Sequence, residues 1–154
     1  MDFQLNLNSE PVTAAYLAEP LAVEPDTTIR EVFGLMRAQR ASSVLVCREG
    51  VLVGIVTERD ALRLLASSDS LDQPIERVMV SQPATIRAEE TVGAAIQKMS
   101  DGGYRRLPVI DAAGRPLGLL RTSGVVRYLV EHFPRTIYTL PPEPNTIMQD
   151  PEGA

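Results

Sequence analysis

The sequence predicts an α/β (α+β) fold in which two β-α-β-β-α repeats pack sheet to sheet around a pseudo-two-fold axis. Three observations support this prediction: the chain contains an internal repeat, both copies show strand and helix patterns in the same order, and the composition is aliphatic. Hydrophobic residues make up 44% of the 154 residues, aromatic residues make up 5%, and Trp is absent. A chain of this length buries roughly 70% of its unfolded surface, so it closes a core without a disulfide or a metal.

The repeat emerges when residues 20–46 are aligned without gaps on residues 83–109. Identical residues then coincide at Pro20/Pro83, Thr28/Thr91, Met36/Met99 and Val46/Val109. After one inserted residue near Ala113, the match continues at Gly50/Gly114, Gly54/Gly118, Arg63/Arg127 and Leu65/Leu129. Self-similarity of this kind indicates a repeated structural unit. The chain is therefore predicted to hold two small units rather than one ordinary domain.

Each unit begins with a short apolar strand, at residues 21–23 and 85–86, and a polar turn then leads into a helix. The residue types that cap helices stand at the expected positions: Thr27 or Thr28, and Glu90 or Thr91. Apolar residues follow at i, i+3, i+4 and i+7, which is the spacing of an amphipathic helix. They are Ile29, Val32, Phe33 and Met36 in the first unit, and Val92, Ala95, Ile96 and Met99 in the second.

Two extended apolar runs and a second helix complete each unit. The runs cover residues 44–47 and 51–56 in one unit and 107–110 and 116–120 in the other, joined by turns that end in glycine. The closing helices are predicted at residues 58–66 and 123–132. Because one unit alone exposes an apolar sheet face, the two units are expected to share one core.

Charge and residue types exclude several functional classes. Fifteen basic and twenty acidic residues give a net charge of −5 without a Lys/Arg-rich block, which argues against nucleic-acid binding. Cys47 and His132 are the only residues of their types, so no disulfide framework and no Cys/His metal site is expected. No nucleophile stands with a base, so we expect no enzyme, no catalytic residue and no required cofactor. Neither a leader nor a membrane-spanning segment is recognisable, which predicts a cytoplasmic protein without a membrane partner.

The strongest local signal is GIVTERD at residues 54–60, where an apolar strand meets the start of a helix. Gly54 permits the close approach of another group. One interpretation of Thr57 and Asp60 is a capping box, in which the Asp60 carboxylate accepts a hydrogen bond from the amide of Thr57. The other is a ligand site, in which Asp60 accepts hydrogen bonds from a vicinal diol such as ribose and the helix N-terminus favours a phosphate.

The second unit departs from this motif. Arg121 stands in place of the threonine, and Gly124 stands in place of Asp60. A helix still begins there, and Thr122 or Ser123 is predicted to cap it. Capping alone therefore does not require the carboxylate, which favours the ligand interpretation of Asp60.

The duplicated unit, the motif GIVTERD and the strand signature RRLPVID at residues 105–111 together resemble a tandem pair of cystathionine β-synthase (CBS) domains, also called a Bateman module. The resemblance covers residues 11–133, and the ending from residue 127 onward is similar to that of small stand-alone bacterial members. It divides the chain into a lead-in at residues 1–10, CBS repeats at 11–68 and 75–133, a linker at 69–74, and a Pro-rich extended tail at 134–154.

The resemblance implies a regulatory module that binds AMP, ADP, ATP or S-adenosylmethionine in clefts between the two repeats. It places Thr57 and Asp60 on the ribose and phosphate, and Ile55 and Val56 along the same cleft. The other site residues that it implies are Met79, Val80, Ala84 and Tyr104 around the adenine, and Arg105 and Arg106 as phosphate contacts or as solvated strand-end charges. A second cleft containing Arg121, Gly124, Ala22 and Ser42 is expected to be empty, weak or changed in specificity.

Two functional interpretations follow from the resemblance. In the first, an adenine nucleotide bound in the cleft modulates an unidentified partner protein or the assembly of the chain itself. In the alternative, the chain is a structural dimerisation module with vacant clefts. Both imply a homodimer, a disc of two CBS pairs joined through their helices. The apolar helix residues available to the core and to this interface are Val32, Leu35, Leu62, Leu65, Val126 and Leu129.

Overall fold

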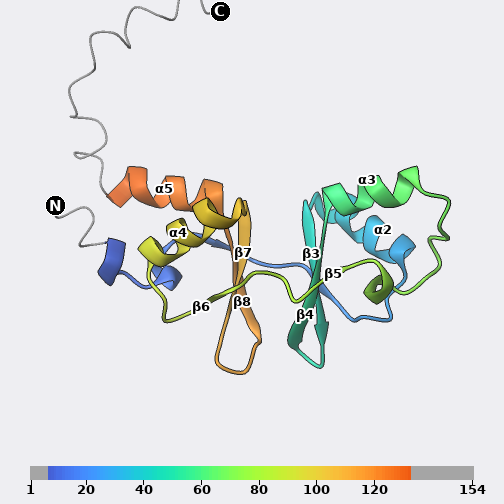
Figure 1. Cartoon of the computed structure of the whole chain (residues 1–154), viewed down its shortest axis with the longest axis horizontal. Helices are drawn as coiled ribbons and strands as arrows, with labels where there is room; N and C mark the ends of the chain where they lie inside the picture. The colour runs from blue at the N-terminus through green and yellow to red at the C-terminus, as the bar shows by residue number, and fades with distance from the viewer. Residues whose placement is uncertain (1–6, 133–154) are drawn as a thin grey trace, which may run out of the picture.

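Two four-stranded sheets stand face to face at the centre of the molecule in a computed structural model that describes residues 7–132 (Figure 1). Two helices cover the outer side of each sheet, so the helices of the two units lie at opposite ends of the molecule. The predicted α/β class and the sheet-to-sheet arrangement are confirmed. The predicted tail at residues 134–154 and most of the predicted lead-in lie outside the described residues.

The first sheet has the order β2-β3-β4-β5. This sheet and the helices that cover it comprise β2 (Ala22–Val23), α2 (Ile29–Gln39), β3 (Ser43–Arg48), β4 (Val51–Thr57), α3 (Glu58–Ala66) and β5 (Val80–Ser81). Helix α2 begins after Thr28, whose hydroxyl accepts a hydrogen bond from the Glu31 amide at 3.1 Å while the Glu31 carboxylate accepts one from the Thr28 amide at 3.4 Å. Of the two caps predicted here, Thr28 is therefore the one that the chain uses.

The second sheet has the order β1-β8-β7-β6. This sheet and the helices that cover it comprise β1 (Leu17–Ala18), β6 (Ile86–Arg87), α4 (Val92–Gly102), β7 (Arg106–Ile110), β8 (Pro116–Arg121) and α5 (Thr122–His132). Thr91 caps α4, because its hydroxyl accepts a hydrogen bond from the Ala94 amide at 3.0 Å.

The start of α5 differs from the prediction. The amide and the hydroxyl of Thr122 both donate to the carbonyl of Arg105, each at 3.0 Å, so this side chain does not cap its own helix. The hydroxyl of Ser123 forms no hydrogen bond within residues 7–132. The first turn of α5 is thus held by the loop before β7 rather than by a hydroxyl cap.

Each unit supplies one edge strand to the other unit's sheet, an exchange that the sequence did not reveal. Strand β1 precedes the first unit in the chain but pairs with β8, with Leu17 opposite Leu120. Strand β5 precedes the second unit but pairs with β4, with Val80 opposite Ile55. Short 3₁₀ turns make the same exchange, at Val12–Ala14 and Ile75–Arg77. The two units are therefore interdependent.

The predicted linker, residues 69–74, packs as part of the first unit. The carbonyl of Gln73 accepts a hydrogen bond from the Ile29 amide at 3.0 Å, and the carbonyl of Leu71 accepts one from the Arg30 amide at 2.9 Å. These bonds satisfy two amides of the first turn of α2, which has no partner for them within the helix.

Each sheet packs against its own helices and forms its own hydrophobic core. The prediction of a single core shared by the two units is therefore wrong. Val44, Val46 and Val56 point toward the helices of the first unit, because alternate strand residues share one face. The opposite face carries a separate, smaller cluster of Leu45, Cys47 and Ile55. Only this thinner layer and its counterpart lie between the sheets, which leaves room for cavities there.

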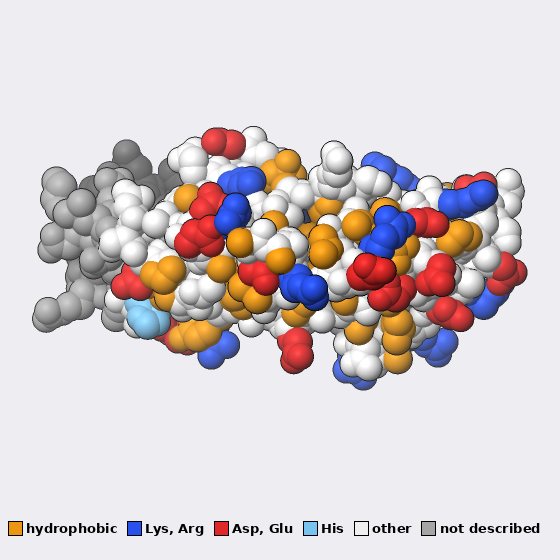
Figure 2. Space-filling model, turned by 90° about the horizontal axis from the view of Figure 1, so that it is seen from below, with side chains coloured by type: hydrophobic (Ala, Val, Ile, Leu, Met, Phe, Trp, Pro, Cys, Tyr) orange, Lys and Arg blue, Asp and Glu red, His pale blue; other side chains and the backbone are white. Residues whose placement is uncertain are grey.

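The hairpin turns of the two units meet at one end of the sheets. Gly50 and Gly114 both have φ of +83°, a left-handed conformation that favours glycine. The amide of Leu52 donates to the carbonyl of Gly114 at 3.0 Å, which ties one hairpin to the other. Figure 2 shows this end of the molecule, where acidic and basic side chains are interspersed with hydrophobic ones. Within residues 7–132, no helix is long and apolar enough to cross a membrane.

Candidate functional site

Two cavities lie between the units, at the end of the sheets opposite the hairpin turns. The first, which we call the Asp60 cavity, has a volume of about 440 Å³ and lies at the start of α3. The second, which we call the Arg121 cavity, has a volume of about 510 Å³ and lies at the end of β8. Residues matched by the internal repeat line both cavities, such as Pro20 in the Arg121 cavity and Pro83 in the Asp60 cavity. The two cavities are thus related by the pseudo-two-fold axis.

The motif residues meet at the mouth of the Asp60 cavity. The Oδ2 atom of Asp60 accepts a hydrogen bond from the Thr57 amide at 2.8 Å and another from the Thr57 hydroxyl at 3.1 Å. The carboxylate therefore closes the N-terminus of α3, as the capping interpretation predicts. Both bonds fall on the same oxygen, and Oδ1 forms no hydrogen bond within residues 7–132. Capping and ligand binding are consequently compatible at this carboxylate.

Eight of the ten residues expected at this site line the Asp60 cavity: Ile55, Thr57, Asp60, Val80, Ala84, Tyr104, Arg105 and Arg106. Val56 and Met79 do not. Val56 is fully buried on the helix-facing side of its sheet, because it alternates with Ile55 along the strand. Met79 packs over Gly54, where an added Cβ would lie 2.3 Å from its sulfur, so the group that Gly54 admits is this side chain.

Several residues of the Asp60 cavity were not predicted from the sequence. They are Glu58, Arg59, Arg63, Pro83, Gly103 and Pro108. Arg59 and Arg63 stand four residues apart on α3, so they share a helix face. This spacing was the sequence feature from which their presence at one site could have been predicted. Together with Arg105 and Arg106 they place four guanidinium groups around one cavity, against the carboxylates of Glu58 and Asp60. The cavity therefore has an excess of positive charge in a chain of net charge −5.

Arg106 connects the two cavities. It lines the Asp60 cavity, and its Nη2 donates to the hydroxyl of Ser42 at 3.3 Å, which lines the Arg121 cavity. Its Nε is buried and has no hydrogen-bond partner within residues 7–132. One guanidinium group thus faces both sites.

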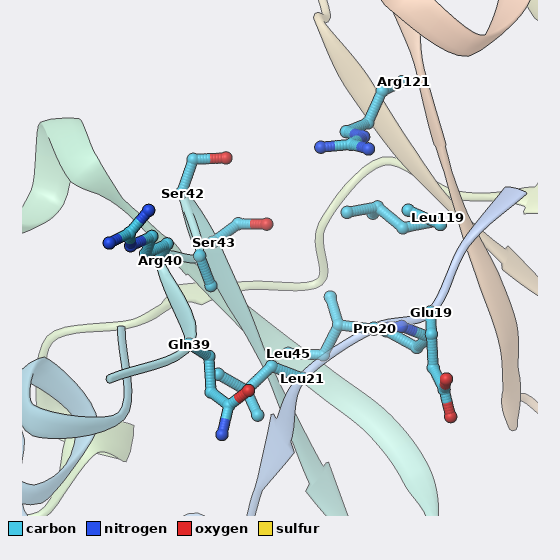
Figure 3. Close-up of a pocket in the computed structure, with 12 residues that line it drawn as sticks. Glu19, Pro20, Leu21, Gln39, Arg40, Ser42, Ser43, Leu45, Leu119 and Arg121 are labelled. Atoms are coloured by element: carbon cyan, nitrogen blue, oxygen red, sulfur yellow. The ribbon is translucent and has the colours of Figure 1, made fainter. Parts of the chain in front are cut away.

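The Arg121 cavity contains two of the four residues expected at the second site, Arg121 and Ser42 (Figure 3). Ala22 is exposed and pairs with Leu45 in the parallel β2–β3 ladder, so it does not line the cavity. Gly124 is also absent from the lining. An added Cβ at Gly124 would lie 2.5 Å from the carbonyl oxygen of Tyr16. The segment before β1 therefore occupies the space that a carboxylate would need.

A cluster on α5 holds Tyr16 in this place. The Tyr16 hydroxyl donates to the Glu131 carboxylate. The guanidinium of Arg127 lies over the Tyr16 ring at 4.4 Å and binds the same carboxylate at 3.0 Å. The hydrogen bond from Tyr16 and then that from Arg127 lower the pKa of Glu131, so it accepts both bonds as a carboxylate at neutral pH.

Within residues 7–132, no group of three or more His, Cys, Asp and Glu side chains could hold a metal ion. Burial raises the pKa of the Cys47 thiol, and Glu24 raises it further. The charged groups that line the two cavities are guanidinium and carboxylate groups.

Comparison with known proteins places this geometry in a family. The sequence model of the CBS domain matches the chain twice, at residues 14–67 and 75–131. The chain belongs to the CBS domain family. A curated relative, the 17.7 kDa protein in the bps2 3′ region of Acidianus ambivalens, is 30% identical over 110 residues, or 71% of this chain. This CBS pair spans 66% of the length of that relative.

Solved structures of CBS-domain pairs share the fold. The CBS domain protein PAE2072 from Pyrobaculum aerophilum, complexed with AMP, has a TM-score of 0.69 and 24% identity, covering 79% of this chain and 97% of that one. The CBS domain pair of MJ0100, in complex with 5′-methylthioadenosine and S-adenosyl-L-methionine, has a TM-score of 0.69 and 23% identity over the same shares of the two chains. These similarities show that the chain shares its fold with these two CBS-domain structures.

Proposed function

We propose that the Asp60 cavity binds an adenosine nucleotide, AMP, ADP or ATP, and that this CBS pair is a regulatory ligand-sensing module rather than an enzyme. The observation that carries the proposal is the free Oδ1 of Asp60 at the mouth of a cavity with four arginine side chains. A carboxylate oxygen suits the hydroxyls of a ribose, and guanidinium groups suit the phosphate. The related AMP complex of PAE2072 supports this choice of ligand.

The remaining lining groups suit the base. Val80, Ala84 and Pro83 come from the segment between the units, and Tyr104 comes from the loop before β7. Tyr104 is 43% exposed, so its ring is available to a ligand. Apolar walls with a few polar groups are the usual lining of a small-molecule site. The adenine is proposed to lie between these walls.

Regulation follows from the position of the cavity. Thr57 and Asp60 belong to the first unit, whereas Tyr104, Arg105 and Arg106 belong to the second. A ligand that contacts both units favours one arrangement of them over others. The proposed readout of nucleotide binding is therefore a change in the affinity of the pair for a partner protein or for a second copy.

Calorimetric titration with AMP, ADP, ATP and S-adenosylmethionine tests the proposal. We expect a saturable isotherm for at least one adenine nucleotide, and a Kd raised about 10-fold or more in Asp60→Ala, because hydrogen bonds to charged groups contribute about 1.5–3 kcal/mol. Asp69→Ala, which removes an exposed carboxylate of the segment between α3 and β5, is the matched control. Absence of binding by all four ligands at millimolar concentration contradicts the proposal.

The 2′-deoxy analogue of the bound nucleotide tests the role of Asp60 itself. Its affinity for the unaltered protein should fall, and Asp60→Ala should weaken it less than it weakens the ribonucleotide, because part of the contact is already absent. Equal weakening of both ligands would mean that Asp60 acts only by capping α3.

A homodimer is proposed on a separate observation, the exposed apolar residues of α3 and α5. Leu62 and Leu65 of α3 are 69% and 62% exposed, and Val126 of α5 is 52% exposed. Both helices lie along the same edge of the molecule in Figure 1. The repeat matches Leu62 to Val126, so a second copy can meet this edge with the same surface on both sides. Val32, which was also predicted as an apolar helix residue for the core or the interface, is fully buried and cannot contact a second copy.

Light scattering tests the dimer. We expect a dimer at micromolar concentration and a monomer for Leu62→Lys/Leu65→Lys, because two buried cations would oppose association. Leu117→Lys is the control, since Leu117 is 52% exposed on β8, away from α3. A monomeric unaltered protein would support neither the dimer nor the alternative role as a dimerisation module.

A further inference from the structure

Ser43 is a buried polar side chain in an otherwise apolar interior. It is 7% exposed, and within residues 7–132 it is the only polar or charged residue in the buried class. Its hydroxyl forms no hydrogen bond with any described residue. The oxygen itself is not fully buried, since Nε of Arg106 is the only fully buried side-chain nitrogen or oxygen without a partner within residues 7–132. Ser43 lines the Arg121 cavity, so its hydroxyl is open to that cavity and available to a ligand there.

The hydroxyl of Ser43 points into the Arg121 cavity. Figure 3 shows the hydroxyls of Ser42 and Ser43 directed toward the side of the cavity where Arg121 and Leu119 lie. The guanidinium of Arg121 extends from the opposite unit toward these serines. It forms no ion pair and no hydrogen bond with another residue of the described part of the chain. A hydroxyl and a free cation thus face each other across an open space.

Ser42 can also donate a hydrogen bond into this space. Its oxygen accepts a hydrogen bond from Nη2 of Arg106 at 3.3 Å, which leaves its own proton for another acceptor. Arg40 adds a second guanidinium to the lining and likewise has no ion pair within residues 7–132. The carboxylate of Glu19 lines the cavity but points away from the serines in Figure 3. The charge that faces the serines is therefore positive, and the serine hydroxyls can donate hydrogen bonds to an anion there.

The same cavity lacks a carboxylate at the position that corresponds to Asp60. Its motif position is Gly124, and the Tyr16 carbonyl closes the space beside it, 2.5 Å from where a Cβ would lie. A nucleoside diol has no carboxylate to meet at that point. Donors without a diol acceptor suit an oxyanion rather than a nucleoside.

We propose that the Arg121 cavity is a second binding site, which takes a phosphate group, free or attached to a small molecule with an apolar body, and does not recognise ribose. Arg121 binds the phosphate oxygens, and Ser43 and Ser42 donate hydrogen bonds to them. The volume of about 510 Å³ exceeds that of a lone phosphate, and Leu21, Leu45 and Leu119 line the rest. An apolar body attached to the phosphate would contact these leucines.

Amide NMR titration of the full chain locates the site. The probes are inorganic phosphate and phenyl phosphate, with phenol as the uncharged control. We expect both phosphates to shift the amides of Ser42, Ser43 and Arg121, with phenyl phosphate binding more tightly, and phenol to leave these amides unshifted at the same concentration. Shifts confined to residues 57–63 and 104–106 would overturn the proposal, because they place the phosphate in the Asp60 cavity alone.

Two variants test the proposed donors. Ser43→Ala and Arg121→Gln should each raise the phenyl phosphate Kd about 10-fold, the scale of a hydrogen bond to a charged group. Arg37→Gln is the matched control, since it removes one positive charge from α2 outside the cavity. If Ser43→Ala fails to fold, the exposed Arg121 still decides the outcome. An unchanged Kd in Arg121→Gln overturns the proposal.

The two proposals fail independently. Ser43→Ala and Arg121→Gln should leave AMP binding at the Asp60 cavity within about twofold, and Asp60→Ala should leave phenyl phosphate binding at Ser43 intact. If the unaltered protein binds phenyl phosphate at Ser43 but no adenine nucleotide, only the nucleotide proposal is contradicted. If it binds AMP but the amides of Ser42, Ser43 and Arg121 do not shift with phosphate, only the second site is contradicted.

Discussion

The Asp60 and Arg121 cavities have the same backbone framework and different chemistry. The repeat matches Asp60 to Gly124, Ser43 to Arg106, and Ser42 to Arg105. One cavity consequently pairs a free carboxylate oxygen with four arginines, and the other pairs hydroxyls with two arginines and has no carboxylate at the motif position. The duplicated fold thus keeps the positions of its strands and helices, while single side chains change the chemical groups that line each cavity.

Helix starts show how the fold tolerates this divergence. In both units the first amide after the closing strand donates to the carbonyl before the hairpin, Glu58 to Ser42 at 3.1 Å and Thr122 to Arg105 at 3.0 Å. This backbone bond does not depend on side chains. The closing helix of the second unit therefore begins without a carboxylate at Gly124, the position that corresponds to Asp60.

The largest expected effect concerns Gly124. Gly124→Ala should lower the free energy of unfolding by about 2 kcal/mol, because the new Cβ would overlap the Tyr16 carbonyl and force backbone movement. Urea unfolding measures the change. Gly34→Ala on α2 is the control: no atom lies within 4 Å of its Cβ, so this variant should be more stable by about 0.5–1 kcal/mol. Equal effects would show that the second cavity is not closed at this point.

The next effect compares the caps of the equivalent helices α2 and α4. Thr28→Ala and Thr91→Ala should each destabilise the protein by about 1 kcal/mol, because each hydroxyl satisfies an amide of the first turn. Thr28→Ala should lower the free energy of unfolding more than Thr91→Ala does, because it also disrupts the capping box in which Glu31 accepts a hydrogen bond from the Thr28 amide. Chemical unfolding of both variants checks the order, and a larger loss for Thr91→Ala would contradict it.

A smaller effect separates the arginines of the two cavities. Arg105→Gln should weaken AMP binding by about three- to tenfold, less than a buried cation would, because this side chain is exposed to water and salt. Arg40→Gln should leave AMP affinity unchanged, because Arg40 lines the other cavity. Titrations at two salt concentrations measure both, and a salt-independent loss for Arg105→Gln would contradict an electrostatic contact.

The smallest effect concerns Cys47, which has no thiol counterpart in the second sheet. Burial and then Glu24 raise its pKa, so the folded protein holds the protonated thiol more strongly than the unfolded chain does. This contribution is present below the ordinary thiol pKa and is lost as the pH rises through the folded pKa. Stability should therefore fall on the alkaline side, and Cys47→Ala should show a flatter profile there. Identical profiles would rule out this linkage.

Local patterns predicted most of the elements. The apolar spacing beginning at Ile29 and Val92 placed α2 and α4, and the glycine turns at Gly50 and Gly114 placed both hairpins. The motif residues Thr57 and Asp60 were likewise identified as a pair. These features depend on residues close together in the chain, so one sequence is sufficient to show them.

The edge strands and two of the site residues were not predictable in this way. Strands β1 and β5 are two residues long and carry no periodic signal, and their partners lie in the other unit. The resemblance to CBS domains placed Val56 and Met79 in the cavity. In the structure, alternation along β4 directs Val56 toward the helices, and Met79 packs over Gly54.

From the sequence alone it was possible to predict that the chain is a tandem repeat, where its main helices and hairpins lie, and that the two motif positions differ. Periodicity, capping and turn residues are local properties, so they can be read without knowing the partners of each element. The folded structure was needed to show that the units exchange edge strands, that Tyr16 closes the space beside Gly124, and that Ser43 lies opposite Arg121. These facts depend on contacts between residues distant in the chain, which arise when the two sheets come together.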